Sequence, residues 1–145
     1  MMIFTTCLII SIPQPTVTNK FLDALIMVES NGDDKAKGDK NRKGVYLARG
    51  CLQIHDIYRR EANRIMRAYV FDDSHRWDRE ASREMARIVL THWAGYHKTK
   101  GVKITPEVLC SLHRHPCSKW VPDNMLSQVE MVRTRKLKAL MRERQ

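Results

Sequence analysis

Glu29 is the side chain whose position best suits it to acid–base chemistry. Leu22, Leu25 and Ile26 precede it by seven, four and three residues. On a helix with a period of about 3.6 residues these positions share one face, so Glu29 continues an apolar stripe. Residues 30–32 read Ser-Asn-Gly and predict the end of that helix, with the glycine suited to a left-handed cap.

Two local effects disfavour the charged form of a carboxylate at this position. Apolar neighbours remove water from the group, and the C-terminal end of a helix carries partial negative charge. A carboxyl group that keeps its proton near neutral pH is what a general acid needs. The same spacing also suits a glutamate that extends from a helix end into solvent.

A long polar segment follows this first helix. Residues 31–50 are rich in Gly, Asp, Asn and Lys, and only residues 45–47 have the composition of a short strand. Loops of this length are uncommon in a small domain and are more often functional than idle. The segment therefore predicts a functional loop directly after Glu29.

Helical periodicity accounts for most of the remaining chain. Thr18 or Asn19 can cap a first helix that begins near Lys20, and Thr105 followed by Pro106 is typical of a helix start. The predicted fold class is mostly α, with about five or six helices and at most a vestigial β element in the long loop. The apolar positions are Ile54, Tyr58, Ala62, Ile65 and Tyr69 in the second helix, Ala81, Met85, Ile88, Val89, His92, Trp93 and Tyr96 in a helix from Asp78 to about His97, and Leu126, Val129, Val132, Leu137, Leu140 and Met141 in the last.

Composition and charge limit the classes of partner. The chain has 145 residues, of which 43% are hydrophobic and 29% charged, as is typical of one globular domain. The formal net charge of +10 is high for this length and indicates a polyanionic partner: nucleic acid, anionic lipid or bacterial cell wall. The last helix is rich in Arg and Lys, either as a solvated face or to retain the protein on an anionic polymer. These basic residues do not form a recognition-helix pattern with base-reading Asn or Gln beside them, so specific nucleic-acid binding is not expected.

Residues 1–17 form an apolar N-terminal extension, and residues 18–145 form the predicted domain. The apolar run from Met1 to Ile10 is too short to span a membrane, and it lacks the basic start and cleavage site of a strong export signal. It is interpreted as a weak signal or anchor, or as a segment that packs on the domain. The sequence predicts no integral membrane segment.

The cysteines do not predict a disulfide framework or a metal site. Cys7, Cys51, Cys110 and Cys117 are few and unevenly spaced, so free thiols are expected. Cys110 and Cys117 flank two histidines in a C-x2-H-x-H-x-C pattern, but this spacing differs from that of the common zinc sites. No metal and no cofactor are predicted.

Two short motifs resemble those of a known family. Glu29-Ser30-Asn31-Gly32 resembles the E-S-x-G segment of the lysozyme-like superfamily, in particular of phage and bacterial lytic transglycosylases. Gly50-Cys51-Leu52-Gln53-Ile54 resembles the G-x-x-Q-I segment that follows in the shorter members. The resemblance covers roughly Leu22 to Trp120 and implies a lysozyme-like helical domain.

The resemblance also implies a reaction. Family members cleave the β-1,4 bond between N-acetylmuramic acid and N-acetylglucosamine in peptidoglycan, with one glutamate as general acid and base. By resemblance, Glu29 is catalytic, Ser30 orients it or the substrate, Gln53 binds sugar and Gly50 permits close backbone approach. Asp33, Asp34 and Asp39 are candidates for a second carboxylate, as in ordinary glycosidases, and Asp39 is the first of them to consider. The expected protein is a monomer that acts in the periplasm, at the cell wall or in a phage virion.

One segment departs from the family pattern. Members usually carry an aromatic residue or histidine followed by Asn and Gly after the penultimate helix. Here His113 matches the first position and would line the groove, while Arg114 replaces the asparagine. Arginine is longer, always charged and cannot accept a hydrogen bond. This departure favours an alternative function, a non-catalytic peptidoglycan-binding or virion structural domain on the same fold.

Overall fold

The fold is mostly helical, as the periodicity predicted. The computed structural model describes residues 17–119 and 128–143, and within these ranges there are five α-helices, one 3-10 turn and no β-strand. Three isolated antiparallel bridges lie in the loop between the first two helices. The elements, in chain order, are α1 (Asn19–Ser30), α2 (Asp56–Met66), η1 (Ser74–Arg76), α3 (Arg79–Thr99), α4 (Pro106–Arg114) and α5 (Gln128–Glu143).

The helices begin where local chemistry predicts. The Thr18 side chain accepts a hydrogen bond from the Phe21 amide, and Asp78 and Thr105 cap α3 and α4 in the same way. The end of α1 differs in detail from the prediction. Asn31 takes the left-handed cap conformation at φ 56°, and Gly32 follows it at φ 89°. Asparagine tolerates this conformation because its short polar side chain can bond locally.

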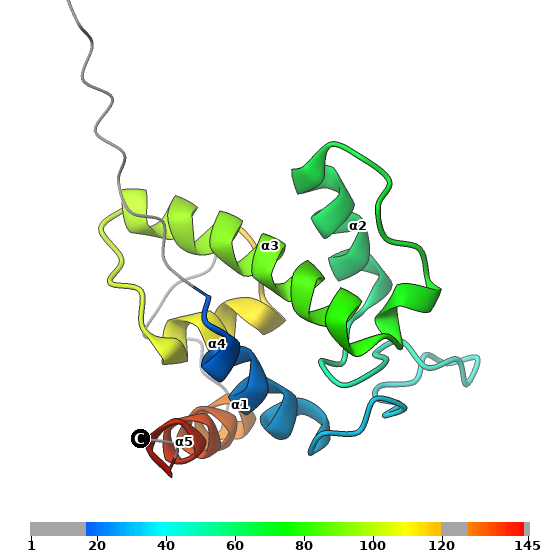
Figure 1. The fold of residues 1–145 in the computed structure, drawn as a ribbon, viewed down its shortest axis with the longest axis horizontal. Coiled ribbons are helices and arrows are strands. Elements are labelled where there is room, and N and C mark those ends of the chain that lie inside the picture. Colours follow the sequence, from blue (N-terminus) through cyan, green and yellow to red (C-terminus); the bar gives the residue numbers. More distant parts are fainter. Residues whose placement is uncertain (1–16, 120–127, 144–145) are drawn as a thin grey trace, which may run out of the picture.

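The core is one cluster of buried apolar side chains that come from all five α-helices and from the end of the loop between α1 and α2. In Figure 1 the long helix α3 crosses the molecule, with α2 along part of its length and α4 and α1 beneath it. The helix α5 packs against both α1 and α4. The largest fully buried side chains are Phe21, Leu22, Leu25, Ile26, Cys51, Leu52, Ile54, Met85, Val89, Leu90, Leu112 and Leu137.

The inner face of α3 differs from the prediction. Met85 and Val89 are buried as expected, but His92 and Tyr96 are exposed and Trp93 is half-buried. The buried stripe instead passes through Ser82, Ala86, Leu90, Ala94 and His97. These residues recur every three or four positions, and small side chains at 82, 86 and 94 allow α3 to approach its neighbours closely. The aromatic residues that looked like core positions lie beside it.

The second helix is also shorter than its periodicity predicted. Ile54 is buried but precedes the helix, and Tyr69 lies beyond its end with 78% of its surface exposed. The helix stops because Arg67 adopts a left-handed conformation at φ 54°. The helical spacing of apolar residues extends to Tyr69, but the helix itself ends at Met66.

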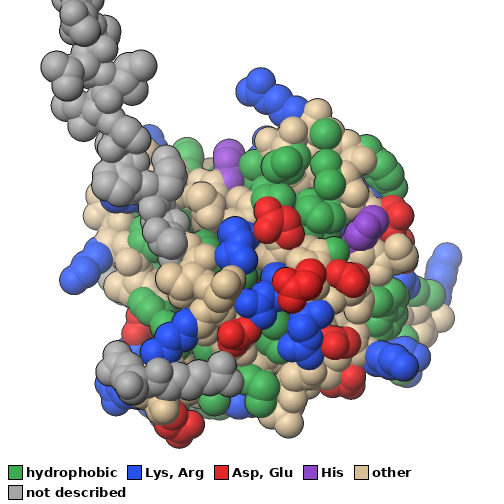
Figure 2. All heavy atoms as spheres, viewed as in Figure 1, with side chains coloured by type: hydrophobic (Ala, Val, Ile, Leu, Met, Phe, Trp, Pro, Cys, Tyr) green, Lys and Arg blue, Asp and Glu red, His purple; other side chains and the backbone are tan. Residues whose placement is uncertain are grey.

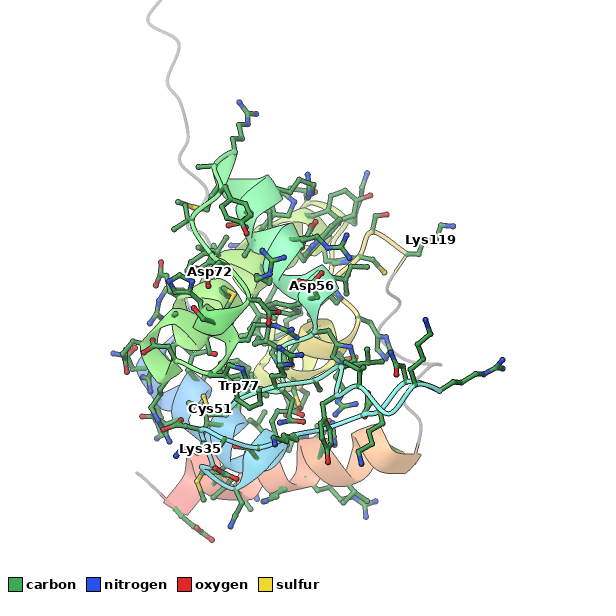
Figure 3. All side chains as sticks on the ribbon, turned by 90° about the vertical axis from the view of Figure 1, so that its right-hand side faces the viewer. Lys35, Cys51, Asp56, Asp72, Trp77 and Lys119 are labelled. Carbon is green, nitrogen blue, oxygen red and sulfur yellow. The ribbon has the colours of Figure 1, made fainter. Side chains whose placement is uncertain are left out.

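Arg76 holds the long loop in place. Its side chain is buried, and its Nη1 atom donates to the carbonyl oxygens of Leu47 and Ile54 at 2.9 and 3.0 Å. Gly50 packs directly against the Arg76 backbone. The backbone of Trp77, directly after η1, also lies close to Gly50; Figure 3 labels Trp77 and Cys51, the residue that follows Gly50. The loop between α1 and α2 is therefore held in place by η1, a turn that comes after α2 in the chain.

Substitution of Gly50 by alanine is expected to destabilise the fold by about 3 kcal/mol or more. A Cβ atom there would lie 2.0 Å from the Arg76 carbonyl oxygen, and the residue also has φ +74°. Gly44→Ala is a matched control, because Gly44 has φ +76° but no atom within 4 Å of the added Cβ. It should cost only the backbone term of about 1 kcal/mol. Urea denaturation measures both, and equal losses would contradict the steric explanation.

Charged side chains are interspersed on the face formed by α1 and α3. Figure 2 shows acidic and basic groups side by side over the middle of this face. Arg83 pairs with Asp23 of α1, and Arg79 pairs with Asp34 of the loop.

None of the helices in the described part of the chain has the length and apolar character needed to cross a membrane. The predicted extension, except for Val17, lies outside the described residues.

Candidate active site

Glu29 lies at the end of α1 with its side chain only 2% exposed. Its Oε2 atom is 3.1 Å from Arg114 Nη2 and 3.2 Å from Arg133 Nη1. Arg114 is the last residue of α4, and Arg133 comes from α5. Both guanidinium groups lie within hydrogen-bond distance of this one carboxylate oxygen. The group that the sequence singled out is therefore held by two arginines in this state.

A groove with a volume of about 690 Å³ runs over Glu29. This lies within the range of about 300–1,000 Å³ that is common for ligand sites. Its walls come from the loop, from α2 and α3, and from the end of α4 with the segment after it. The residues that line it are Glu29, Gly38, Asp39, Ala48, Gln53, His55, Ile57, Tyr58, Glu61, Trp93, His113, Arg114, His115, Pro116, Cys117 and Arg133.

Gln53 enters the groove through an unusual backbone conformation. Its φ of 51° is left-handed, and its Nε2 atom donates to the Gly50 carbonyl at 2.9 Å. A Cβ atom on Gly38 would lie 2.1 Å from Gln53 Oε1, so only glycine leaves room for this amide. The bond to Gly50 occupies part of the NH2 group and fixes the amide orientation. Its carbonyl oxygen faces Gly38 within the groove.

His113 belongs to a buried hydrogen-bonded network beneath the groove. Its Nε2 atom lies 2.9 Å from the Leu52 carbonyl and its Nδ1 atom lies 3.1 Å from the Tyr58 hydroxyl. Since a carbonyl can only accept, Nε2 carries the proton and Nδ1 accepts from Tyr58. Burial lowers the pKa of His113 and raises that of Tyr58, and the charge of Glu29 raises the Tyr58 pKa further. The network is therefore neutral and joins α2, α4 and the loop.

Stability is expected to fall as the pH drops below about 6.5, with His113 as one cause. The folded-state pKa of His113 lies below its ordinary value of 6.5, so the unfolded chain takes up its proton first. In His113→Gln, whose amide can donate to Leu52 and accept from Tyr58, this dependence is lost. The difference in unfolding free energy between wild type and variant should narrow on acidification, by at most about 1.4 kcal/mol per pH unit. Denaturation at several pH values measures it, and a constant difference would contradict the assignment.

Trp93 provides an apolar wall that the sequence had assigned to the core. Its Nε1 atom donates to Glu61 Oε1 at 3.0 Å, and Glu61 also pairs with Arg64 at 2.7 Å. Ring contacts with His92 and Tyr96 hold the indole on the other sides. The polar edge of the ring is satisfied, so the half-buried ring is available as an apolar surface in the groove. The helical spacing correctly predicted that Trp93 lies on a helix, but it could not distinguish a core position from one that lines the groove.

Asp39 also lines the groove. Its Oδ2 atom lies 3.3 Å from His55 Nε2, and both side chains are substantially exposed at 74% and 40%. An exposed pair of this kind contributes little to stability. Asp39 therefore lies in the groove in an environment far more hydrated than that of Glu29.

Two residues suggested by the family motifs lie outside the groove. The Ser30 hydroxyl donates to the Ile26 carbonyl at 3.2 Å within α1. Gly50 contacts the Arg76 backbone, and this approach brings two parts of the chain together. Glu29, Gln53 and His113 are thus brought to one site, while Ser30 and Gly50 support the elements that carry it.

Arg133, like Trp93, is a groove residue that the sequence did not predict. It stands 104 positions after Glu29, on a helix interpreted only as a basic surface. On the same helix, Lys136 Nζ donates to the Met27 carbonyl at 2.8 Å, and Lys138 pairs with Glu107. Cations of α5 therefore bind the negative end of α1 and its carboxylate. The run of basic residues was the only sequence signal for this contact.

The cysteine and histidine pattern does not converge. Within the described ranges, no group of three or more His, Cys, Asp or Glu side chains could hold a metal ion. Cys110 is buried, Cys117 is exposed, and the carbonyl of Cys117 bonds His97 Nε2 at 2.8 Å. Burial raises the pKa of the Cys51 thiol to about 11, which argues against a nucleophilic role for it.

Comparison of the chain with known protein families, with curated proteins and with solved structures finds no match.

Proposed function

We propose that this protein is a lysozyme-like enzyme that cleaves the MurNAc-β-1,4-GlcNAc bond of peptidoglycan, with Glu29 as its single general acid and base. One observation carries the proposal: the nearly buried side chain of Glu29 lines a groove together with Gln53 and the Trp93 ring. A carboxyl group shielded from solvent suits a general acid in glycoside cleavage. An amide and an aromatic ring suit the binding of a sugar.

Glu29 would act first as an acid and then as a base. It gives its proton to the glycosidic oxygen that leaves, and then takes a proton from the attacking hydroxyl. The attacking hydroxyl belongs either to water or to the 6-position of the muramic acid itself. Gln53 would hydrogen-bond the sugar, and the indole of Trp93 would pack against the apolar face of a pyranose ring.

Digestion of purified peptidoglycan tests the proposal. The protein is incubated with insoluble sacculi, and the soluble muropeptides are analysed by mass spectrometry. A transglycosylase yields anhydro ends and a hydrolase yields reducing ends, which differ in mass by one water. Absence of soluble fragments both from sacculi and from glycan strands freed of their peptides would contradict an enzymatic function.

A specific observation favours a second candidate, a non-catalytic peptidoglycan-binding or virion structural domain. Arg114 and Arg133 both contact Glu29, and a carboxylate held in this way cannot donate a proton. Such a domain would sediment with insoluble sacculi and release nothing. The same digestion distinguishes the two candidates, because pellet and supernatant are measured together.

A further inference from the structure

More positive charge contacts Glu29 than its own negative charge balances. Arg114 and Arg133 approach the same Oε2 atom, so two positive charges and one negative charge leave one positive charge. Arginine stays protonated at any pH at which the protein is folded. This group of three side chains therefore carries a net charge of +1 within the groove.

The arginines are also the accessible members of this group. Their side chains are 33% and 28% exposed, against 2% for Glu29. All three line the groove, so an entering ligand meets the guanidinium groups before the carboxylate. A neutral sugar that displaced Glu29 from the two arginines would leave them without a negatively charged partner. A ligand with its own carboxylate can replace Glu29 as the partner of both arginines.

We infer that Arg114 and Arg133 form a carboxylate-recognition site, and that the enzyme acts on glycan strands whose muramic acid carries a free lactyl carboxylate. In peptide-substituted peptidoglycan that carboxylate is an amide and carries no charge. The inference rests on the proposed function and names the substrate class of the same groove. It makes Arg114, which departs from the family pattern, a specificity residue.

The exchange would also prepare Glu29 for catalysis. Once the arginines bind the substrate, Glu29 Oε2 no longer accepts hydrogen bonds from two guanidinium groups. The carboxyl group is then open to the glycosidic oxygen. The other charged or titratable groups near Glu29 or along the groove come from four elements and from the segment after α4. They are Tyr58 and Glu61 from α2 (Glu61 paired with Arg64), neutral His113 from α4, Lys136 from α5 on the Met27 carbonyl, Asp39 with His55 from the loop, and His115 and Cys117 after α4.

A purely structural role for the arginines makes a different prediction. Arg133 and Lys136 join α5 to the end of α1, so the contacts could serve only to hold the two helices together. In that case, removal of either guanidinium lowers the unfolding free energy but does not change which ligand binds. The choice between a carboxylate and its neutral amide is therefore the informative measurement.

Calorimetric binding of three disaccharides tests the inference. GlcNAc-β-1,4-MurNAc carries the free lactyl carboxylate and lacks the bond that the enzyme would cleave. Its lactyl methylamide is the matched neutral ligand, and chitobiose lacks the lactyl group. We expect the wild type to bind the carboxylate about tenfold more tightly than either neutral sugar. Arg114→Gln and Arg133→Gln should each reduce this preference severalfold, whereas Arg135→Gln, which changes an exposed residue of the same helix, should keep it.

The outcomes separate this inference from the proposed function. Equal affinity for the acid and its methylamide, or an unchanged preference in both variants, would overturn the inference. If sacculi are nevertheless digested, the proposed function stands without it. If no disaccharide binds and neither sacculi nor peptide-free glycan strands are cleaved, both fail. Supporting evidence on whole strands would be faster cleavage of peptide-free glycan than of peptide-substituted glycan, with the difference lost in Arg114→Gln.

Discussion

Glu29→Gln is expected to lower the rate of muropeptide release by about a thousandfold, which is within the usual contribution of a general acid–base residue. Glutamine has nearly the same shape, and its carbonyl oxygen can still accept a hydrogen bond from Arg114 or Arg133. Both arginines are partly exposed, so water can solvate the charge that loses its partner. The helical circular dichroism should therefore stay unchanged while the activity is lost.

Two further variants show that the effect belongs to Glu29. Glu84→Gln removes the same charge from an exposed position of α3 that pairs with Arg87 outside the groove, and it should keep the wild-type rate. Asp39→Asn tests for a second catalytic carboxylate. Because Asp39 is 74% exposed, we expect its loss to reduce the rate by less than about tenfold. Wild-type release by Glu29→Gln, or complete loss in Asp39→Asn, would assign the acid to another residue.

Trp93→Ala is expected to weaken glycan binding by about thirtyfold, or ~2 kcal/mol, in the range of an aromatic binding hot spot. The ring is held by the bond to Glu61 and by neighbouring rings, so little conformational entropy is lost when a sugar packs on it. The effect should appear mainly in KM, because the indole is not a proton donor or acceptor for the reacting atoms. Initial rates at several concentrations of soluble glycan separate KM from kcat.

Trp93→Phe is the conservative control for this prediction. Phenylalanine cannot donate a hydrogen bond to Glu61, but it keeps an aromatic surface. Trp93→Phe should therefore bind glycan almost as tightly as the wild type. A large loss in both variants would show that the hydrogen bond to Glu61 matters and not the apolar surface. If alanine leaves KM unchanged, the ring is not part of the glycan site.

Local features of the sequence were sufficient for the helical framework. Thr18, Asp78 and Thr105 are followed by helices because their side chains satisfy backbone amides within three residues. The apolar spacing before Glu29 placed that residue at the end of a buried stripe for the same reason, since a helix repeats at a short period. Mistakes arose where a stripe was extended too far, as at Tyr69, or rotated, as at His92.

The composition of the groove depends on contacts between distant parts of the chain. The sequence alone identified Glu29, Gln53 and His113 as candidates, and it identified Arg114 as an unusual neighbour. Only the packing of α5 on α1 brought Arg133 to the same carboxylate, and only the packing of α3 beside α2 turned Trp93 from a core position into a groove wall. Local periodicity specifies which face of a helix is apolar, but the helices that cover that face determine which of its residues remain open to a ligand.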